Sequence, residues 1–290
     1  MNILFCLFTF CFASQEQLSA FQQDEISWQK QREAQMTSDE SWLSLVGLYW
    51  LKEGANTFGT DSANDFVLPI HSTVLKAGTF TLKDGKVTYR MERGQRAEVD
   101  GKLRNNGRLA MGEVLAHNHL RIFLIERGDR LALRIRDMRA KGLVQFKSLE
   151  FYAPKDKYRV EAVYEPFETP QKLIVGTVID TEIELWVPGV LKFEIDGLPL
   201  EILPTLESKQ DNQFFIMFKD QTAGATTYSG GRFLYTPLPT DGKLVINFNR
   251  AINPPCAYTA YATCPLPPAE NWLGVPIEAG ERTYRPSSHD

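Results

Sequence analysis

The sequence predicts an all-β protein, a sandwich or a barrel, with one helix near its N-terminus. After residue 54, apolar and polar residues alternate with period two, and Gly, Asp and Pro mark frequent turns. Before it, residues 15–36 are rich in Gln, Glu, Lys and Ala, which favour helix. Apolar residues make up 43% of the chain, which is ample for a packed core.

The first fifteen residues form an uncharged apolar run that ends in small residues. This run is typical of a signal peptide at 1–14, although no Lys or Arg precedes it; a buried N-terminal helix is the alternative. Cleavage after Ala13 or Ser14 removes Cys6 and Cys11, and both follow Phe, which disfavours a lipoprotein box. We expect an exported protein, periplasmic or secreted. No other apolar run is long enough to cross a membrane, so we expect no transmembrane segment.

A helical N-terminal segment is predicted at residues 15–53. Leu18, Phe21 and Trp28 have near-helical spacing within an expected helix at 16–35. The apolar stretch 41–51 is expected to pack this segment onto the body of the protein. An aromatic platform for a ligand is the alternative reading of the same stretch.

Hairpins are predicted beyond residue 54. Asp84-Gly85 supplies the positive φ for a tight turn between strands at 79–82 and 87–90. Strands at 121–126 and 130–137 form a second hairpin, in which Leu131, Leu133 and Ile135 face one side and Arg134 and Arg136 the other. Further strands are expected at 143–152, 159–164, 174–186, 192–195, 214–219, 232–235 and 243–248.

The proline-bearing, polar stretch 166–171 is the best candidate for a boundary between two β-rich halves. The expected organisation is an N-terminal half at 54–166, a C-terminal half with a Cys/Pro-rich loop at 167–284, and a tail at 285–290.

Three runs carry a resemblance to a known family. They are Ser-Trp-Leu-Ser-Leu-Val-Gly-Leu-Tyr-Trp-Leu-Lys-Glu-Gly at 41–54, Asp-Gln-Thr-Ala-Gly-Ala-Thr-Thr-Tyr at 220–228, and the Pro- and Cys-bearing run at 247–272. The chain resembles the bacterial and archaeal DUF1684 family of unknown function. The resemblance implies a recurring module whose activity is unassigned.

Residues 57–69 look like the opening of a forkhead-associated domain, a β-sandwich that reads phosphothreonine. Thr60 stands where that family uses Arg, and Ile-His-Ser-Thr at 70–73 has no Ser-Arg-x-His counterpart. The resemblance therefore implies sandwich geometry without phosphothreonine binding, because charge-assisted phosphate donors are missing.

Composition and motifs exclude several functions. A net charge of −4 argues against nucleic acid as a partner. The glycine-rich, His-Glu-x-x-His and Gly-x-Ser-x-Gly signatures of common nucleotide enzymes and hydrolases are absent from the sequence. His117 and His119 have the spacing of metal ligands in a strand, but a solvated strand end or turn is the favoured reading. We expect no cofactor and no metal.

The polar, glycine-rich connection 220–232 is the favoured functional loop, because such loops carry function on β scaffolds. Tyr228, Arg232 and Arg250 can together bind a carboxylate or phosphate. Asp220 is either a general base or the partner that holds Arg232. A buried Asp–Arg–Tyr network without a ligand is the alternative. The full set of expected ligand-binding residues is Tyr228, Arg232, Asn249, Arg250, Asn253 and Tyr258.

Cys256 and Cys264 lie in a loop where five prolines prevent regular structure. In an exported protein they are expected to form a disulfide. An inert reduced pair, and metal or redox chemistry, are the alternatives.

The expected function is therefore that of an exported protein that binds a small anionic molecule or glycan in the C-terminal half. The alternative is an enzyme, a hydrolase or lyase, that uses Asp220 or Glu270 as its acid or base.

Overall fold

The computed structural model describes residues 18–208 and 210–285. Only 13% of the chain is helical, and the protein is mostly β with several sheets, which confirms the predicted fold class. The expected signal segment 1–14 and residues 286–290 of the tail lie outside the described residues.

The N-terminal half is a sandwich of two sheets. One has the strand order β1-β11-β10-β9-β6-β7 and the other β3-β2-β4-β5-β8. A single core lies between them, with Phe58 and Phe80 from one sheet against Ile122 and Leu133 from the other. The strands of the first sheet are β1 Leu45–Trp50, β6 Ala97–Val99, β7 Lys102–Arg104, β9 Val114–His117, β10 Leu120–Arg127 and β11 Arg130–Asp137. Those of the second are β2 Gly54–Gly59, β3 Phe66–Val67, β4 Gly78–Lys83, β5 Lys86–Met91 and β8 Asn106–Leu109.

The C-terminal half packs a four-stranded sheet, in the order β14-β13-β12-β17, near a two-stranded sheet of β15 and β16. Ile216 and Phe218 of the small sheet share a buried core with Leu191 and Ile246 of the larger one. The strands are β12 Arg159–Gly176, β13 Glu182–Ile195, β14 Leu198–Ile202, β15 Gln213–Phe218, β16 Arg232–Pro237 and β17 Lys243–Asn247.

Both predicted hairpins form. Asp84 and Gly85 have φ values of 50° and 69°, as the turn between β4 and β5 requires. Strands β10 and β11 pair in antiparallel register from Leu120 opposite Asp137 to Arg127 opposite Arg130. Local sequence thus decides these elements, because turn chemistry and alternation agree.

Other expected elements differ from the structure. Residues 45–50 form strand β1, not part of a helical segment, and pair with β11. The stretch 143–152 contains the short helix α2 (Lys141–Val144) and irregular chain instead of a strand. The strand expected at 174–186 is broken by a turn at 177–181 between β12 and β13. Strand β12 runs through the boundary expected at 166–171, where the register shifts at a bulge, so the halves meet earlier, between β11 and β12.

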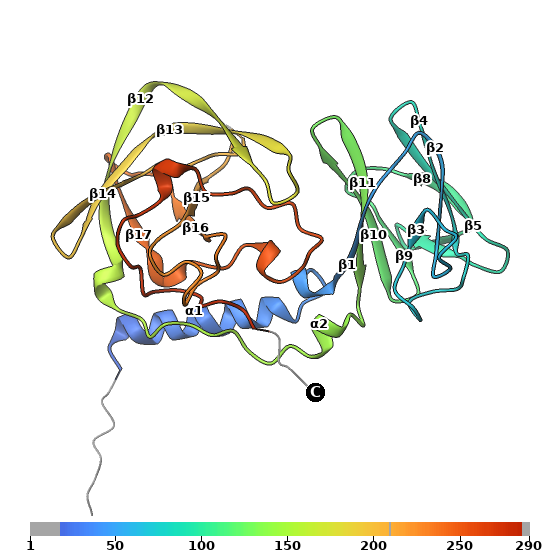
Figure 1. Cartoon of the computed structure of the whole chain (residues 1–290), viewed down its shortest axis with the longest axis horizontal. Helices are drawn as coiled ribbons and strands as arrows, with labels where there is room; N and C mark the ends of the chain where they lie inside the picture. Colours follow the sequence, from blue (N-terminus) through green and yellow to red (C-terminus); the bar gives the residue numbers. More distant parts are fainter. Residues whose placement is uncertain (1–17, 209, 286–290) are drawn as a thin grey trace, which may run out of the picture.

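Helix α1 (Ala20–Met36) runs along one side of the C-terminal half and leads into β1 of the other half (Figure 1). It overlaps the helix expected at 16–35. Short 3₁₀ turns complete the structure, at Trp42–Ser44, Asp156–Tyr158, Phe248–Arg250, Pro255–Ala257 and Ala269–Asn271. Among the described helices, none has the length and apolar character needed to span a membrane.

Candidate functional site

Helix α1 docks on the C-terminal half through polar side chains. A capping box starts the helix: the Ser19 hydroxyl accepts a hydrogen bond from Gln22 N, and the Gln22 side chain accepts one from Ser19 N. Its buried residues are Glu25 and Met36. A carboxylate is thus among the groups that the helix buries, and such a group needs partners.

Arg250 supplies the main partner of Glu25. The Arg250 Nε donates to Glu25 Oε2 at 3.0 Å, and its Nη2 donates to Glu25 Oε1 at 3.1 Å. Nη2 also donates to Asp24 at 2.6 Å, and Asn247 donates to Glu25 at 2.9 Å. Burial alone would lower the pKa of Arg250, but these two carboxylates hold it above its ordinary value.

A second set of polar contacts lies farther along the helix. Arg32 Nε donates to Glu281 Oε1 at 2.8 Å, and the Glu281 carboxylate is fully buried. Glu281 Oε2 accepts from the Tyr258 hydroxyl at 2.6 Å and from Asn253 N at 2.7 Å. Burial, together with the neighbouring Glu281, raises the pKa of Tyr258 well above its ordinary value. This network fixes Arg32 in place.

A cavity of about 340 Å³ lies between these two anchors. Its lining residues are Trp28, Gln31, Arg32, Gln35, Tyr235, Arg250 and Ile252. Four come from α1, one from β16, and two from the chain that follows β17. The lining combines two aromatic rings, two guanidinium groups and two amides, which is the mixture of apolar and orienting groups that small-molecule sites use.

Charges around this cavity are nearly balanced. Arg32 and Arg250 contribute the positive groups. Arg32 forms an ion pair with Glu281, and Arg250 forms one with Glu25. Asp24 adds a further negative charge at the exposed side of Arg250. The Arg250 guanidinium also lies 5.8 Å from the centre of the Trp28 ring. The cavity therefore presents polar donors without a strong net field.

Asp220 and Arg232 lie together, but neither is among the residues that line this cavity. Arg232 is 1% exposed and donates to Asp220 Oδ2 at 3.3 Å, to Ile277 O at 2.9 Å and to Ala279 O. Asp220 also accepts from Ile277 N at 2.6 Å and from the Thr222 hydroxyl at 2.8 Å. Burial lowers the pKa of Arg232, and Asp220 opposes that shift. The Asp–Arg part of the buried network, the alternative interpretation of this loop, is present, but the Tyr228 hydroxyl donates to Cys256 O and not to this pair.

The remaining expected residues have distinct surroundings. The buried Asn249 side chain exchanges hydrogen bonds with both backbone groups of Lys155, at 2.9 and 3.0 Å. Asn253 donates to Arg282 O at 2.7 Å. Glu270 is exposed in the 3₁₀ turn Ala269–Asn271. Of the expected ligand-binding residues, Arg250 lines the cavity and Tyr258 and Asn253 support it through Glu281.

Cys256 and Cys264 lie next to each other as free thiols. The backbone N of Cys256 is 3.1 Å from Cys264 Sγ, and the Tyr228 hydroxyl donates to Cys256 O at 3.4 Å. A hydrogen bond from Cys264 lowers the pKa of Cys256 to about 7, against the opposing effect of burial. Burial is the largest cause that raises the pKa of Tyr228.

His117 at the end of β9 and His119 in the turn that follows each contact protein groups. The buried His117 ring donates from Nδ1 to Arg96 O at 2.9 Å and accepts at Nε2 from the Thr73 hydroxyl at 2.7 Å. His119 lies 3.5 Å from Asp137. Within residues 18–208 and 210–285, no group of three or more His, Cys, Asp or Glu could hold a metal ion.

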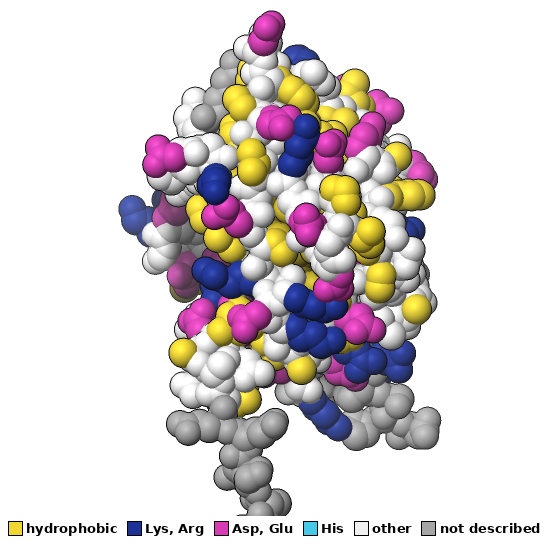
Figure 2. All heavy atoms as spheres, turned by 90° about the vertical axis from the view of Figure 1, so that its left-hand side faces the viewer, with side chains coloured by type: hydrophobic (Ala, Val, Ile, Leu, Met, Phe, Trp, Pro, Cys, Tyr) yellow, Lys and Arg dark blue, Asp and Glu magenta, His cyan; other side chains and the backbone are white. Residues whose placement is uncertain are grey.

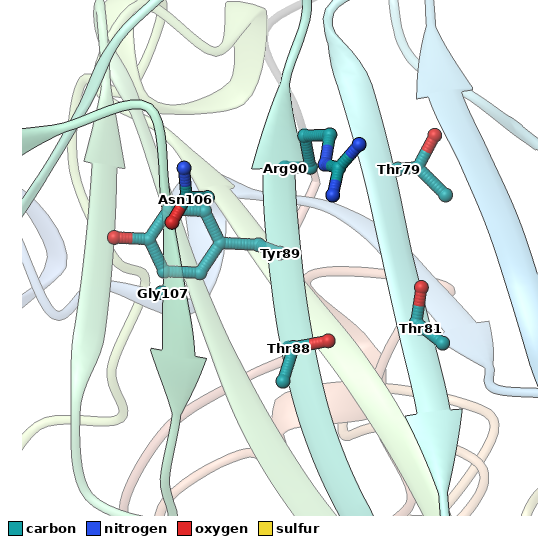
Figure 3. A pocket seen from close by; sticks show the side chains of 7 residues that line it. All are labelled: Thr79, Thr81, Thr88, Tyr89, Arg90, Asn106 and Gly107. Atoms are coloured by element: carbon teal, nitrogen blue, oxygen red, sulfur yellow. The ribbon is translucent and has the colours of Figure 1, made fainter.

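A larger hollow of about 530 Å³ lies on the five-stranded sheet of the N-terminal half (Figure 3). Thr79 and Thr81 on β4 stand beside Thr88 and Arg90 on β5, and the Tyr89 ring extends toward Gly107. Short threonine side chains dominate this hollow, with one charged group. Its lining has one aromatic ring and one guanidinium group, whereas the cavity beside α1 has two of each.

The end of the molecule formed by the C-terminal half carries mixed charge. Figure 2 shows acidic, basic and apolar side chains interspersed over this face. Exposed ion pairs of this half include Lys192 with Glu165 and Lys243 with Glu161, both at 2.6 Å. No single sign of charge dominates the face that Figure 2 shows, so it lacks the character of an anion-binding surface.

Sequence reasoning missed most of the cavity lining. Gln31 and Gln35 are four residues apart, and Trp28 and Arg32 are also four apart, so all four share one side of the helix. That spacing was visible in the sequence. Tyr235 and Ile252 carried no comparable local signal, because their place depends on the pairing of Phe233 with Ile252.

Comparisons with known proteins agree with the resemblance read from the sequence. Residues 144–282 match the model of a family described as a protein of unknown function, DUF1684. The chain belongs to this family. The match begins where the C-terminal half begins and includes every lining residue that this half supplies to the cavity. No curated protein matches the chain.

Several solved structures are similar to parts of the chain. An uncharacterised protein of Haloarcula marismortui is 34% identical, with 48% of this chain and 77% of that one covered and a TM-score of 0.41. The FHA domain of FhaA, solved with the intracellular domain of Rv3910, is 16% identical, with 31% of this chain and 97% of that one covered and a TM-score of 0.24. An FHA domain from a study of phosphothreonine-dependent interactions is 17% identical, with coverages of 32% and 95% and a TM-score of 0.24.

Proposed function

We propose that this protein is an exported binding protein that holds a glycan in the cavity between α1 and the C-terminal half. The observation that carries the proposal is the lining itself. Trp28 and Tyr235 supply ring faces, while Gln31, Gln35 and Arg250 supply amide and guanidinium groups around about 340 Å³. Sugar rings have apolar faces and hydroxyl edges, and such a lining complements both.

Charge balance favours a glycan over a free anion as the ligand. Each guanidinium in the lining already has a carboxylate partner, and Asp24 adds another acid nearby. An anion would therefore meet little net attraction. A neutral hydroxyl can still accept from a guanidinium or donate to a glutamine oxygen without displacing the ion pair. A small anionic molecule is the second ligand class that the test must include.

Binding is favoured over catalysis at this cavity. Its lining residues include no carboxylate, and neither Asp220 nor Glu270 is among them. The Asp220 oxygens accept hydrogen bonds from Ile277 N, Thr222 and Arg232. A hydrolase or lyase that uses Asp220 would need to break this buried network before it moved a proton.

Export and a Cys256–Cys264 disulfide are part of the same proposal. The apolar run at residues 1–14 supports export, and the 3.1 Å separation of Cys256 N from Cys264 Sγ supports a bond between the two sulfurs. Outside the cytoplasm, a disulfide-bearing oxidant would accept the two electrons and two protons of the thiols, be reduced to a dithiol, and leave Cys256 and Cys264 joined. The resulting small loop stabilises the Pro-rich segment by about 2–3 kcal/mol.

The experiment is a calorimetric titration of the purified chain with a panel of neutral oligosaccharides and, separately, of small carboxylates and phosphates. The test variant is Gln31→Ala with Gln35→Ala, which removes two exposed amides from the lining. The matched control is Ser27→Ala with Lys30→Ala, on exposed positions of the same helix outside the lining. We expect a neutral saccharide to bind, and the test variant to weaken it about tenfold, or roughly 1.4 kcal/mol.

A panel in which only small anions bind would contradict the glycan assignment. Equal losses in the test and control variants would contradict the location.

A further inference from the structure

Five arginines lie on one face of the sheet formed by β10 and β11. Alternation puts Ile122, Leu124, Leu133 and Ile135 into the core of the N-terminal half. The intervening positions face the other way, toward the side on which the C-terminal half lies (Figure 1). We call this surface the arginine face; its arginines are Arg121, Arg127, Arg130, Arg134 and Arg136.

The register brings these arginines close together. Arg121 is directly opposite Arg136, and Arg127 is directly opposite Arg130. Arg134 lies between those two pairs, opposite Phe123. Like charges directly opposite one another on a sheet are destabilising. A sequence that places four arginines in two such pairs incurs this cost without an evident gain to folding.

Aromatic rings and carbonyls accommodate these groups instead of carboxylates. Arg130 lies 4.1 Å from the centre of the Trp50 ring, Arg134 lies 5.5 Å from that of Trp42, and Arg136 lies 5.5 Å from that of Phe123. Within the described part of the chain, none of the five forms an ion pair.

Their hydrogen bonds go to neutral oxygens. Arg121 donates to Asn118 O and Leu120 O, and Arg127 donates to Glu126 O and the Thr263 hydroxyl. Arg136 donates to Asp39 O. Asp39 and Glu40 lie near Arg136 and partly oppose the lowering of its pKa by burial.

Arg134 lies at the centre of the arginine face and lacks hydrogen-bond partners for part of its guanidinium group. It is 5% exposed, its Nε has no hydrogen-bond partner, and its Nη2 reaches only the Thr263 hydroxyl at 3.5 Å. Burial, then the neighbouring Arg127 and Arg136, lowers its pKa to about 10. It therefore stays charged at neutral pH. A buried charge normally has a counter-ion, and this one lacks it within the described chain.

The shape of the surroundings restricts what can supply that counter-ion. The Pro- and Cys-bearing loop of the C-terminal half touches the face through Thr263, and the Thr259 hydroxyl donates to Leu45 O at 3.5 Å. A flat membrane cannot reach Arg134 beside this loop. Arg121 and Arg127 are six residues apart on one strand, which is ~20 Å at 3.3 Å per residue. The guanidinium groups are therefore spread over a length that suits a chain of charged groups better than one small anion.

We propose that the arginine face binds a linear acidic polysaccharide, whose carboxylate or sulfate groups pair with the guanidinium groups. The planar fork of Arg matches such oxyanions in bidentate geometry. Single-stranded nucleic acid is less suited, because the three aromatic rings already carry a guanidinium each and are not open for base stacking. This surface is separate from the cavity beside α1, so the inference does not depend on the glycan proposed there.

The experiment measures binding of the full chain to polygalacturonate and to heparin, by calorimetry at low and at moderate salt. The test variant is Arg121→Gln, Arg127→Gln and Arg130→Gln, which leaves the buried Arg134 in place. The matched control is Arg93→Gln, Arg104→Gln and Arg108→Gln, three exposed arginines of the same half with the same loss of charge. Thermal unfolding checks that both variants are folded.

We expect at least one of the two polysaccharides to bind the wild-type chain, and salt to weaken the binding. The test variant should bind about tenfold more weakly or worse, while the control stays within about twofold of wild type. Arg134→Lys, which keeps the charge but loses the planar fork, should also weaken binding.

Three results would overturn the proposal. One is no binding of either polysaccharide to the folded wild-type chain. Another is an equal loss in the test and control variants, which would indicate attraction by overall charge alone. The third is tighter binding of oligothymidylate or of phosphatidylserine vesicles, lost in the test variant, which would assign the face to a nucleic acid or a membrane.

Discussion

Arg250 donates hydrogen bonds from Nε and Nη2 to both oxygens of the buried carboxylate of Glu25, a residue 225 positions earlier in the chain. This pair joins the first helix to the 3₁₀ turn Phe248–Arg250, which follows the last strand. It also fixes the wall of the cavity that Trp28 and Arg250 share. A contact between segments far apart in the sequence therefore shapes the proposed binding site.

Glu25→Ala should destabilise the fold by about 2 kcal/mol, because it leaves Arg250 and Asn247 without their shared acceptor. Urea unfolding measures the change. The control is Asp24→Asn, whose side chain is 70% exposed in its pair with Arg250 and which should cost about 0.5 kcal/mol or less. Equal effects of the two changes would show that the buried pair does not anchor the helix.

Arg232→Met should cost about 3–5 kcal/mol, because Asp220 then stays buried without its cationic partner. Lys157→Met, which breaks an exposed pair with Asp196, serves as the control and should change stability little. Denaturant unfolding distinguishes the two. If Arg232→Met folds as stably as wild type, the buried network does not support the fold in the way its contacts suggest.

Stability should fall as the pH drops below about 6.5, partly through His117. Burial lowers the pKa of His117 from its ordinary value, so below that value the unfolded chain binds a proton that the folded chain resists. The free energy of unfolding therefore keeps its full value above the pKa that His117 has in the unfolded chain. It declines as the pH falls from there toward the lower pKa that His117 has in the folded chain. Unfolding between pH 7 and pH 5 measures the slope, which His117→Gln should flatten; an unchanged slope in this variant would contradict the role of His117.

In the reduced protein, Cys256 should react with iodoacetamide before Cys264. A hydrogen bond with Cys264 lowers the pKa of Cys256 to about 7. The same hydrogen bond is the largest cause that raises the pKa of Cys264. The rate of alkylation at Cys256 should therefore rise through pH 7, and mass mapping assigns the site. In material recovered after export, neither cysteine should react until a reductant is added. Rapid alkylation of unreduced exported protein would contradict the disulfide.

The sequence predicted elements whose causes are local. Asp84-Gly85 has the positive φ values that its turn requires, and the alternation in β11 correctly separates Ile135 from Arg136. The boundary expected at 166–171 did not form, because Pro166 lies at a bulge inside a long strand, where its missing N–H is tolerated. Composition alone does not distinguish such a bulge from a linker.

The candidate site was less predictable, because distant segments build it. Arg250 was among the expected residues, yet its partner on α1 follows only from the docking of the helix. Arg232 has a guanidinium group that could bind an anion, but this group donates its hydrogen bonds to the backbone carbonyls of Ile277 and Ala279. Sequence reasoning cannot foresee which of two arginines the fold will bury, since that depends on contacts between segments far apart in the chain.

The most direct test of the proposed site is a ¹⁹F NMR spectrum of protein labelled with 5-fluorotryptophan, recorded with and without the saccharide that binds. The chain contains five tryptophans, so single Trp→Phe variants can assign every signal. Binding in the cavity beside α1 should shift the signal of Trp28, which lines it, and leave that of Trp272, 59% exposed and outside the lining, unchanged. A bound saccharide that shifts Trp272, or the Trp42 and Trp50 signals, while Trp28 stays in place would contradict the assignment.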